Sequence, residues 1–327
     1  MRAIRVKSPG GPESLELVEV ADPNPAAHEV LIEVHASALN RADLLQRRGR
    51  YPAPPGESDI IGLECAGIVR DIGRETSRFK VGDRVMALLG GGGYAERVRV
   101  HENLVLPIPE RLDFKQAAAV PEAFLTAYEA LFTAAELSPG ERVLIHAGAS
   151  GVGIAALQIA RELGAQVFST LRSDFKREHL QALGAHVISS TNEDFVEVIE
   201  RETRARGVDV IVDLVGATYA ANNQRALAAG GRWIVVGLLG GAQAAVDLSK
   251  LLMKRQTLRG IVMRSRPLPE KTAIVRGFLR DLWPWLDAGR LTPVIDRTFA
   301  LGDAALAHAY MESNKNVGKI ILSVKGE

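Results

Sequence analysis

Three closely spaced glycines near the middle of the chain have the types and spacing of a phosphate-binding turn. Gly148, Gly151 and Gly153 lie in the stretch HAGASGVG, which follows a short apolar segment and precedes an apolar stretch that ends at Gly164. Glycines let a backbone approach a pyrophosphate without a Cβ in the way, and the unpaired N–H groups of a helix's first turn attract an anion. The alternative is a plain tight turn in an α/β domain, so the neighbouring segments must decide.

The residues after the next expected strand, at 166–170, indicate which dinucleotide this turn would bind. In such a fold an acidic residue about 20 positions past the glycines normally binds the ribose 2′-hydroxyl of NAD. Here Thr170 is followed by Arg172, Ser173 and Lys176, and the first acid, Asp174, comes late. A hydroxyl and cations suit a 2′-phosphate, which predicts NADPH. Alternatively, Ser173 caps the next helix and the basic residues form a solvated face.

The elements around the turn support a dinucleotide fold. Residues 111–260 alternate near-continuous apolar strands with helices, which predicts a parallel sheet covered on both faces. Six such strands make an α/β, doubly wound (Rossmann) sheet the expected fold. Residues 1–110 instead contain short segments that are rich in β-branched residues and partly alternate between apolar and polar positions. Gly, Pro and Asp turns separate these segments, a pattern typical of an antiparallel barrel or rolled sheet. Residues 261–327 are expected to pack back on that β-rich part.

The composition excludes several functional classes. The chain has 327 residues, with 40 Lys plus Arg against 39 Asp plus Glu, so it carries no global basic field for nucleic acid or a membrane surface. Its apolar runs are shorter than a membrane span, and the N-terminus has no signal-peptide pattern. The single cysteine, Cys65, rules out an intrachain disulfide. These features predict a cytoplasmic protein.

Several stretches along the chain resemble the zinc-independent quinone oxidoreductases of the medium-chain dehydrogenase/reductase superfamily. They are ASALNRADLLQRRGRYPAPPG (36–56), QAAAVPEAFLTAYEAL (116–131), VLIHAGASGVG (143–153), GGRWIVVGLLGG (230–241) and YMESNKNVGKIIL (310–322). The resemblance implies a discontinuous, β-rich, GroES-like catalytic domain (1–120 and 261–327) and a Rossmann domain (121–260). It also implies a homodimer, and reduction of quinones by NADPH bound in the cleft between the domains.

The zinc ligands of the related alcohol dehydrogenases are missing from the matching positions. Asn40 begins the segment where their first cysteine motif lies, and Leu63 replaces the histidine of a Gly-His-Glu triplet. A tetrahedral zinc site needs such thiolate and imidazole ligands, so no metal site is expected.

The resemblance also assigns site residues. It places Asn40 and Tyr51 beside the nicotinamide and the substrate. One departure is Ser190, which stands where the family often has a tyrosine that contacts the 2′-phosphate; its hydroxyl could still bind phosphate. The implied cofactor contacts are Thr126, Ser150, Gly151, Val152, Ser173, Lys176, Ser190, Val215, Gly237, Leu238, Met263, Arg264, Ser265 and Asn316.

Hydride transfer to a quinone needs positioning and a hydrogen-bond donor for the developing oxyanion. Tyr51, in the proline-braced loop GRYPAPPG, is the expected donor, and the alternative is a hydrophobic lid. Asn40 contacts substrate or only caps the helix expected at 41–48. The apolar segment at 258–262 is an expected edge strand through which a homodimer would pair.

Two other functions remain open at this point. The same cleft could reduce α,β-unsaturated carbonyls (enones or enals), which a direct comparison of acceptors would reveal. The chain could instead be an NADPH-binding sensor or an RNA-binding protein, as some relatives are thought to be, although its near-zero net charge argues against RNA.

Overall fold

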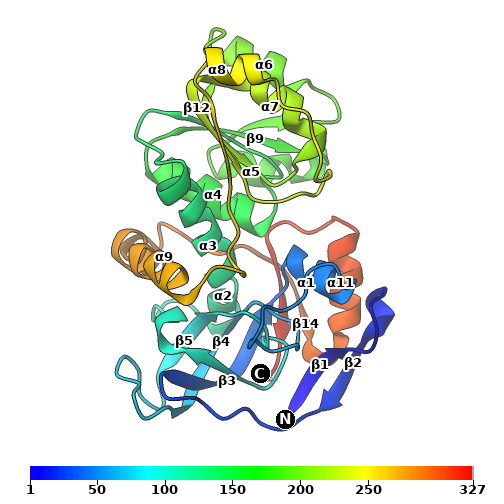
Figure 1. The fold of residues 1–327 in the computed structure, drawn as a ribbon, viewed down its shortest axis with the longest axis vertical. Helices are drawn as coiled ribbons and strands as arrows, with labels where there is room; N and C mark the ends of the chain where they lie inside the picture. Colours follow the sequence, from blue (N-terminus) through cyan, green and yellow to red (C-terminus); the bar gives the residue numbers. More distant parts are fainter. Residues whose placement is uncertain (326–327) are drawn as a thin grey trace. The chain divides into compact units, whose positions relative to one another are not determined.

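The structure, a computed structural model, describes residues 1–325. The chain divides into two compact units. The parallel-sheet unit comprises Thr126–Val262, and the discontinuous β-rich unit comprises Met1–Leu125 together with the residues from Met263 onward. Figure 1 shows both units as ribbons.

The parallel-sheet unit contains one six-stranded sheet in which every neighbouring pair of strands is parallel. In spatial order its strands are β10 (His186–Ser189), β9 (Gln166–Leu171), β8 (Arg142–Ile145), β11 (Val208–Asp213), β12 (Leu227–Val235) and β13 (Thr257–Gly260). The order of strands reverses between β8 and β11, as in a doubly wound dinucleotide fold. The predicted fold class of this part is confirmed.

Helices connect these strands. They are α4 (Gly151–Glu162), α5 (Arg177–Ala182), α6 (Phe195–Glu202), α7 (Ala220–Ala226) and α8 (Leu248–Met253). Side chains from five strands, such as Phe168 and Trp233, form a buried core with apolar residues of α6 and α7. Burial of this apolar surface explains why the strands are near-continuously hydrophobic.

The β-rich unit contains a seven-stranded, mostly antiparallel sheet and a separate pair, β1 (Arg2–Val6) with β2 (Leu15–Glu19). The central strand β3 alternates between buried and half-buried positions over most of its length, as expected for a sheet with one face in the core. The strands of the larger sheet are β14 (Ile295–Ala300), β15 (Lys319–Ser323), β3 (Glu29–Ala38), β4 (Glu64–Ile72), β5 (Arg84–Leu88) and β7 (Val105–Pro107), with β6 (Arg97–His101) paired to β3.

The tail of the chain is part of this sheet, because β15 pairs antiparallel with β3, with Ile321 opposite Ala38. The remaining helices are α1 (Arg41–Arg47), α2 (Phe114–Ala118), α3 (Pro121–Tyr128, which crosses the unit boundary), α9 (Leu268–Asp281), α10 (Trp283–Asp287) and α11 (Ala304–Glu312). Helix α11 lies beside α1 (Figure 1), joined to it by the contact of His308 with Arg47.

Two local predictions differ from the structure. The sequence from Glu270 to Ala288 predicts one helix, but the structure divides it into α9 and α10, because Pro284 lacks an N–H and its ring disfavours continuation of the helix. Strand β14 was not predicted, since most of its residues are exposed and its sequence, IDRTFA, shows no clear alternation. Within residues 1–325, no helix is both long enough and apolar enough to cross a membrane.

Candidate functional site

The glycine turn joins β8 to α4 and is too tight for side chains. A Cβ on Gly148 would lie 1.9 Å from the Ser169 hydroxyl oxygen, and one on Gly153 would lie 2.6 Å from the Ala147 carbonyl oxygen. The Ser150 hydroxyl accepts a hydrogen bond from the Gly153 N–H at 3.1 Å, so Ser150 caps the helix.

Two donors of this first helical turn remain available. Within residues 1–325 the backbone N–H groups of Gly151 and Val152 have no hydrogen-bond partner. Unpaired N–H groups at the N-terminus of a 12-residue helix suit a pyrophosphate. The turn therefore fits a dinucleotide.

A buried polar network holds the turn against neighbouring strands. His146 bridges the Thr170 hydroxyl, at 2.9 Å, and the Asn223 side-chain oxygen, at 2.6 Å. The Asn223 amide then donates to Asp213 at 2.9 Å. Burial lowers the pKa of His146, so the ring is neutral in this network. The network fixes the carboxyl ends of β8, β9 and β11 relative to one another.

The end of β9 presents a hydroxyl but no free carboxylate. Asp174 accepts hydrogen bonds from Arg177 and Asn192, at 3.3 and 2.9 Å, so its charge is already engaged. The Ser173 side chain does not cap the following helical turn, contrary to the capping alternative. Lys176 is buried, with its Nζ 5.4 Å from the centre of the Phe175 ring.

The other predicted cofactor residues lie in both units. The Ser190 hydroxyl donates to the Leu171 carbonyl at 3.0 Å, so its proton is already used at the end of β9. The N–H groups of Val215 and Gly237 bond to Asp213 at the carboxyl ends of β11 and β12, and Leu238 is exposed. These residues share one edge of the sheet with the glycine turn. Thr126 is in α3; Met263, Ser265 and Asn316 are in the β-rich unit.

A buried ion pair lies in the β-rich unit next to Asn40. Glu64, at the start of β4, and Lys319, at the start of β15, approach to 2.7 Å and are 0% and 6% exposed. The Asn40 side chain joins them: its amide nitrogen donates to Glu64 at 2.8 Å, and its oxygen accepts from Lys319 at 2.7 Å. Asn40 stands at the N-cap position of α1, yet its amide is engaged by this pair.

Every donor and acceptor of this ion pair has a partner. Lys319 also donates to the Leu39 carbonyl at 2.7 Å, and the second oxygen of Glu64 accepts the Glu122 backbone N–H at 2.8 Å. A buried pair is tolerated when such hydrogen bonds satisfy both charges.

A second buried network runs from α1 to α11. The Tyr94 hydroxyl donates to Asp43 at 3.1 Å and contacts His308 Nε2 at 3.2 Å, while His308 Nδ1 lies 3.3 Å from Arg47. Arg47 can only donate, so Nδ1 accepts and the Nε2 proton points to Tyr94. Burial lowers the pKa of His308 to about 3, so the ring stays neutral. Arg47 also pairs with Glu312.

Asp43 is the polar end of this network and lies close to Asn40. One of its oxygens accepts the Asn40 backbone N–H at 2.7 Å, and the other has no hydrogen-bond partner within residues 1–325. Burial raises the pKa of Asp43 to about 6. Asp43 therefore orients the segment that carries Asn40.

Tyr51 is half-buried, and Arg264 holds its loop. The Arg264 guanidinium donates to the Tyr51 carbonyl at 3.1 Å and lies 5.2 Å from the ring centre. It also donates to the Gly90 carbonyl and to Gln46. Burial, and then the charge of Glu122, raises the pKa of the Tyr51 phenol above its usual value. Within the described part of the chain its hydroxyl has no hydrogen-bond partner, so it can donate to a ligand.

The residues of the β-rich unit do not supply an evident metal site. Leu63 is buried, and burial raises the pKa of the Cys65 thiol, which disfavours the thiolate that zinc needs. Among residues 1–325 no group of three His, Cys, Asp or Glu side chains is arranged to hold a metal ion.

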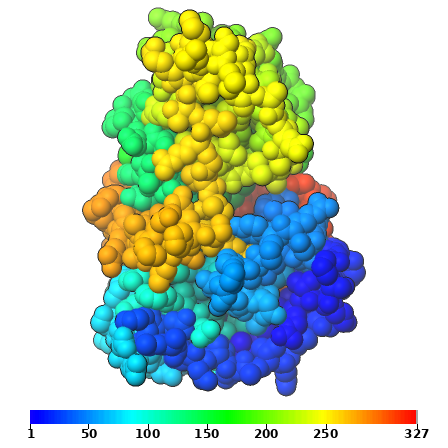
Figure 2. Space-filling model, in the orientation of Figure 1, coloured from blue at the N-terminus to red at the C-terminus, as the bar shows by residue number. Residues whose placement is uncertain are grey.

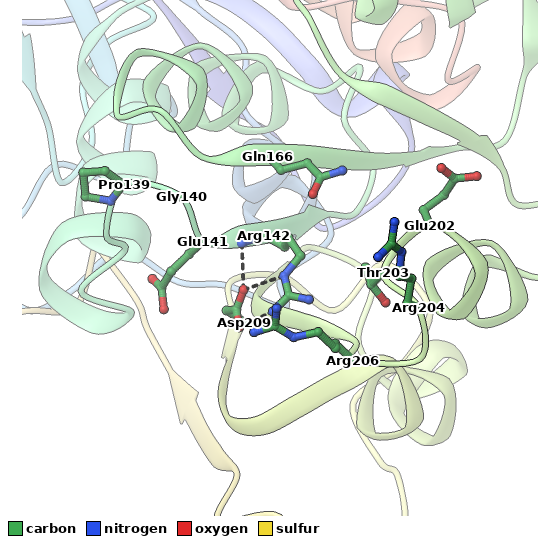
Figure 3. A pocket seen from close by; sticks show the side chains of 10 residues that line it. All are labelled: Pro139, Gly140, Glu141, Arg142, Gln166, Glu202, Thr203, Arg204, Arg206 and Asp209. Atoms are coloured by element: carbon green, nitrogen blue, oxygen red, sulfur yellow. Dashed lines mark hydrogen bonds and ion pairs between the residues drawn. The ribbon is translucent and has the colours of Figure 1, made fainter.

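A cavity of about 580 Å³ lies in the parallel-sheet unit, at the opposite edge of the sheet from the glycine turn. Arg142, at the start of β8, and Asp209, near the start of β11, form a two-bond ion pair on its wall (Figure 3). Ligands of doubly wound sheets bind at the carboxyl ends of the strands, so this cavity is not the predicted dinucleotide site.

The sequence did not identify Glu64, Lys319, Glu122, Tyr94 or His308 as part of a site. They come from strands, helices and a loop that are far apart in the chain, and only the tertiary fold brings them together. Only Glu64 has a sequence signal, because it occupies the glutamate position of the Gly-His-Glu triplet in the zinc dehydrogenases.

Comparison with known proteins defines the family. Residues 26–110 match the alcohol dehydrogenase GroES-like domain, and residues 183–322 match the zinc-binding dehydrogenase domain. Over 326 residues the chain is 36% identical to the quinone oxidoreductase of Rattus norvegicus, covering 98% of this chain and 97% of that protein. The chain belongs to the medium-chain dehydrogenase/reductase family.

Solved structures of this family share the whole fold. A quinone oxidoreductase of Pseudomonas syringae pv. Tomato DC3000 is 31% identical with a TM-score of 0.87, covering 99% of both chains. CurK enoyl reductase is 30% identical with a TM-score of 0.87, again over 99% of both chains. The chain is therefore a nucleotide-dependent oxidoreductase of this family with a GroES-like and a Rossmann domain.

Proposed function

We propose that this medium-chain reductase transfers hydride from NADPH to a quinone without zinc. The observation that carries the proposal is the Asn40–Glu64–Lys319 cluster, which fills the region of the missing zinc ligands with groups that hydrogen-bond one another. The resemblance over almost the full chain to proteins named quinone oxidoreductases supports the choice of acceptor.

NADPH is proposed as the cofactor because of the chemistry at the end of β9. Within the described chain no free carboxylate lies there to bind a ribose hydroxyl, because Asp174 is engaged by Arg177 and Asn192. Ser173 and Lys176 are the proposed contacts of the 2′-phosphate, and Ser190 would join them only by releasing its hydrogen bond to the Leu171 carbonyl. Ser150, Gly151 and Val152 are the proposed contacts of the pyrophosphate.

When bound, NADPH supplies the hydride. The protein's own contribution is to position the acceptor and to stabilise negative charge on its oxygen. Tyr51 is proposed to donate a hydrogen bond to that oxygen, because its hydroxyl is protonated and has no partner in the described chain. Asn40, fixed between Glu64 and Lys319, is proposed to line the acceptor site. The further proposed cofactor contacts are Thr126, Val215, Gly237, Leu238, Met263, Arg264, Ser265 and Asn316.

A second candidate function is reduction of α,β-unsaturated carbonyls. The structural similarity to CurK enoyl reductase favours it specifically. The same donor would then stabilise an enolate oxygen while hydride reaches carbon.

We further propose a homodimer formed through β13. All four residues of this strand, Thr257–Gly260, are exposed, and among residues 1–325 the strand pairs only with β12. An exposed edge strand has free backbone donors and acceptors that a symmetry mate can satisfy. The preceding helix α8 adds exposed apolar side chains, with Leu252 and Met253 both 76% exposed. Figure 2 shows this segment, in yellow, on the surface.

An acceptor screen tests the proposed function. The purified protein is assayed with NADPH and NADH against a benzoquinone, an enone and an enal, and with primary alcohols plus NADP⁺. Faster oxidation of NADPH with the quinone is expected, unchanged by a zinc chelator. Alcohol oxidation that the chelator abolishes would contradict it, and a higher kcat/KM for the enone would favour the second function.

A further inference from the structure

Two glutamates, Glu64 and Glu122, are influenced by the buried ammonium of Lys319, and Glu64 pairs with it directly. Glu64 takes almost all the available donors: the Lys319 ammonium at 2.7 Å, the Asn40 amide at 2.8 Å and the Glu122 backbone N–H at 2.8 Å. Its charge is therefore fully compensated. When two carboxyl groups lie near each other and one has most of the hydrogen-bond donors, the carboxyl group with fewer donors retains its proton to higher pH.

Glu122 is the less satisfied carboxyl. It lies in the first turn of α3, and within residues 1–325 its side chain has no hydrogen-bond or ion-pair partner. Burial, and then the negative charge of Glu64, raises the pKa of Glu122 to about 8, and Asp43 acts in the same direction. Lys319 and Arg264 act in the opposite direction without cancelling the shift.

The two carboxyl groups also differ in access. Glu64 is completely buried, whereas Glu122 is partly exposed. Glu122 is close enough to Tyr51 for its charge to raise the pKa of that phenol. Glu122 therefore combines a retained proton, a charge that acts on the proposed donor Tyr51, and a partly exposed side chain that a ligand or water can reach.

We propose that Glu122 is the proton donor of the reaction, acting on the acceptor oxygen that Tyr51 hydrogen-bonds. This role depends on the proposed function. The acceptor gains two electrons and one hydrogen as the hydride from NADPH, which becomes NADP⁺. The resulting anionic oxygen takes the proton of the Glu122 carboxyl as the O–H bond of that carboxyl breaks. Water then returns a proton to the Glu122 carboxylate, so the overall reaction consumes one proton.

The kinetic test compares wild type with Glu122→Gln, Glu122→Asp and the control Glu110→Gln, an exposed glutamate of the same unit. Glu122→Gln should lower kcat at pH 7 by roughly 100-fold or more and leave KM for NADPH within about twofold. Wild-type kcat should fall as the pH rises through about 8, and this fall should be absent in Glu122→Gln and retained in Glu122→Asp. The control should behave as wild type.

An independent measurement reports the proton itself. Infrared difference titration of the protein without ligands should show a carboxylic acid band that disappears near pH 8 in wild type and is missing in Glu122→Gln.

Thermal unfolding provides a check of folding. The pKa of Glu122 is raised in the folded state, so its contribution to stability is lost as the pH rises through about 8. Glu122→Gln should match the wild-type Tm at pH 4 and exceed it at pH 9.

The outcomes separate this role from the proposed function. Active wild type together with unchanged kcat and pH profile in Glu122→Gln would overturn the role of Glu122 alone. A carboxylic acid band that disappears near the usual pKa of a glutamate would also overturn the proposed role of Glu122. A wild-type protein that reduces neither quinones nor enones would overturn the proposed function and this role with it.

Discussion

Tyr51 and Arg264 show how single side chains could prepare the proposed site. Arg264 uses its guanidinium on the Tyr51 carbonyl, the Gly90 carbonyl and Gln46, so it fixes the loop rather than facing solvent. Tyr51 then keeps its hydroxyl free and protonated. Such a preorganised donor stabilises a developing oxyanion without having to reorganise during the reaction.

Tyr51→Phe should separate chemistry from cofactor binding. Loss of one preorganised donor typically lowers kcat by about 10²–10³-fold, while the Kd for NADPH should change by less than about twofold. Steady-state kinetics with a quinone and fluorescence titration with NADPH measure the two effects. The matched control is Tyr310→Phe. Tyr310 lies on α11, and its hydroxyl donates a hydrogen bond to Asp296 at 2.8 Å. Unchanged turnover in Tyr51→Phe would remove Tyr51 from any chemical role.

Substitutions after β9 should change cofactor preference. Lys176→Ala removes a cation from the proposed 2′-phosphate site, so it should weaken NADPH binding by about tenfold and leave NADH nearly unchanged. Ser173→Asp places a carboxylate near the expected ribose and should invert the preference toward NADH. Kd values for both cofactors measure these changes. Equal losses for both cofactors in Lys176→Ala would contradict the assignment of the phosphate site.

The candidate site was only partly predictable at the residue scale. Asn40 and Tyr51 are predicted by the family resemblance, because both lie in a stretch, residues 36–56, that matches the family. Lys319 lies 279 positions from Asn40, and no local pattern connects the two. No sequence pattern marks Glu122, because its raised pKa depends on burial and on the charge of Glu64, which only the fold brings near it.

Elements were more predictable than individual contacts. The alternation of apolar strands and helices predicted the six-stranded parallel sheet, because burial on both faces requires near-continuous hydrophobic strands. Strand β14 and helix α8 were missed since both are largely exposed and lack a clear apolar period. The prediction of a single helix after Glu270 was wrong, because Pro284 has no N–H and its ring interrupts the helix despite the apolar pattern.

The edge strand β13 gives a prediction at the scale of an element. Leu258→Asp puts like charges close together across a two-fold strand pair and should convert the proposed dimer to a monomer. Sedimentation velocity at micromolar concentration measures the change. The control is His186→Asp, an exposed residue of β10 at the opposite edge of the sheet. A wild-type monomer, or an intact dimer in Leu258→Asp, would contradict pairing through β13.

At the scale of the whole molecule, the Asp43–Tyr94–His308 network links three distant parts of the sequence. Tyr94→Phe removes the hydrogen bond to Asp43, so the free energy of unfolding should fall by about 1–3 kcal/mol. Urea denaturation at pH 5 and pH 8 measures this change.

The pH dependence of that variant follows from Asp43. Its folded-state pKa is raised to about 6, so its contribution to stability is present below the pKa of the unfolded chain and is lost as the pH rises through about 6. The Tyr94 hydrogen bond lowers the pKa, and its removal raises it further. Tyr94→Phe should therefore be more destabilising at pH 8 than at pH 5. Equal destabilisation at both pH values would mean that Asp43 does not titrate in this range.

The pairing of β15 with β3 has a consequence for the order in which the protein matures during synthesis. Lys319 enters only with β15, which the ribosome makes after the entire parallel-sheet unit. The parallel-sheet unit is continuous and can fold while the tail is still being translated. Until β15 is made, Glu64 and Asn40 lack their cationic partner, so burial of the Glu64 carboxylate in a shorter chain would leave its charge uncompensated. We therefore expect the β-rich unit to complete its folding only after the last strand has been made.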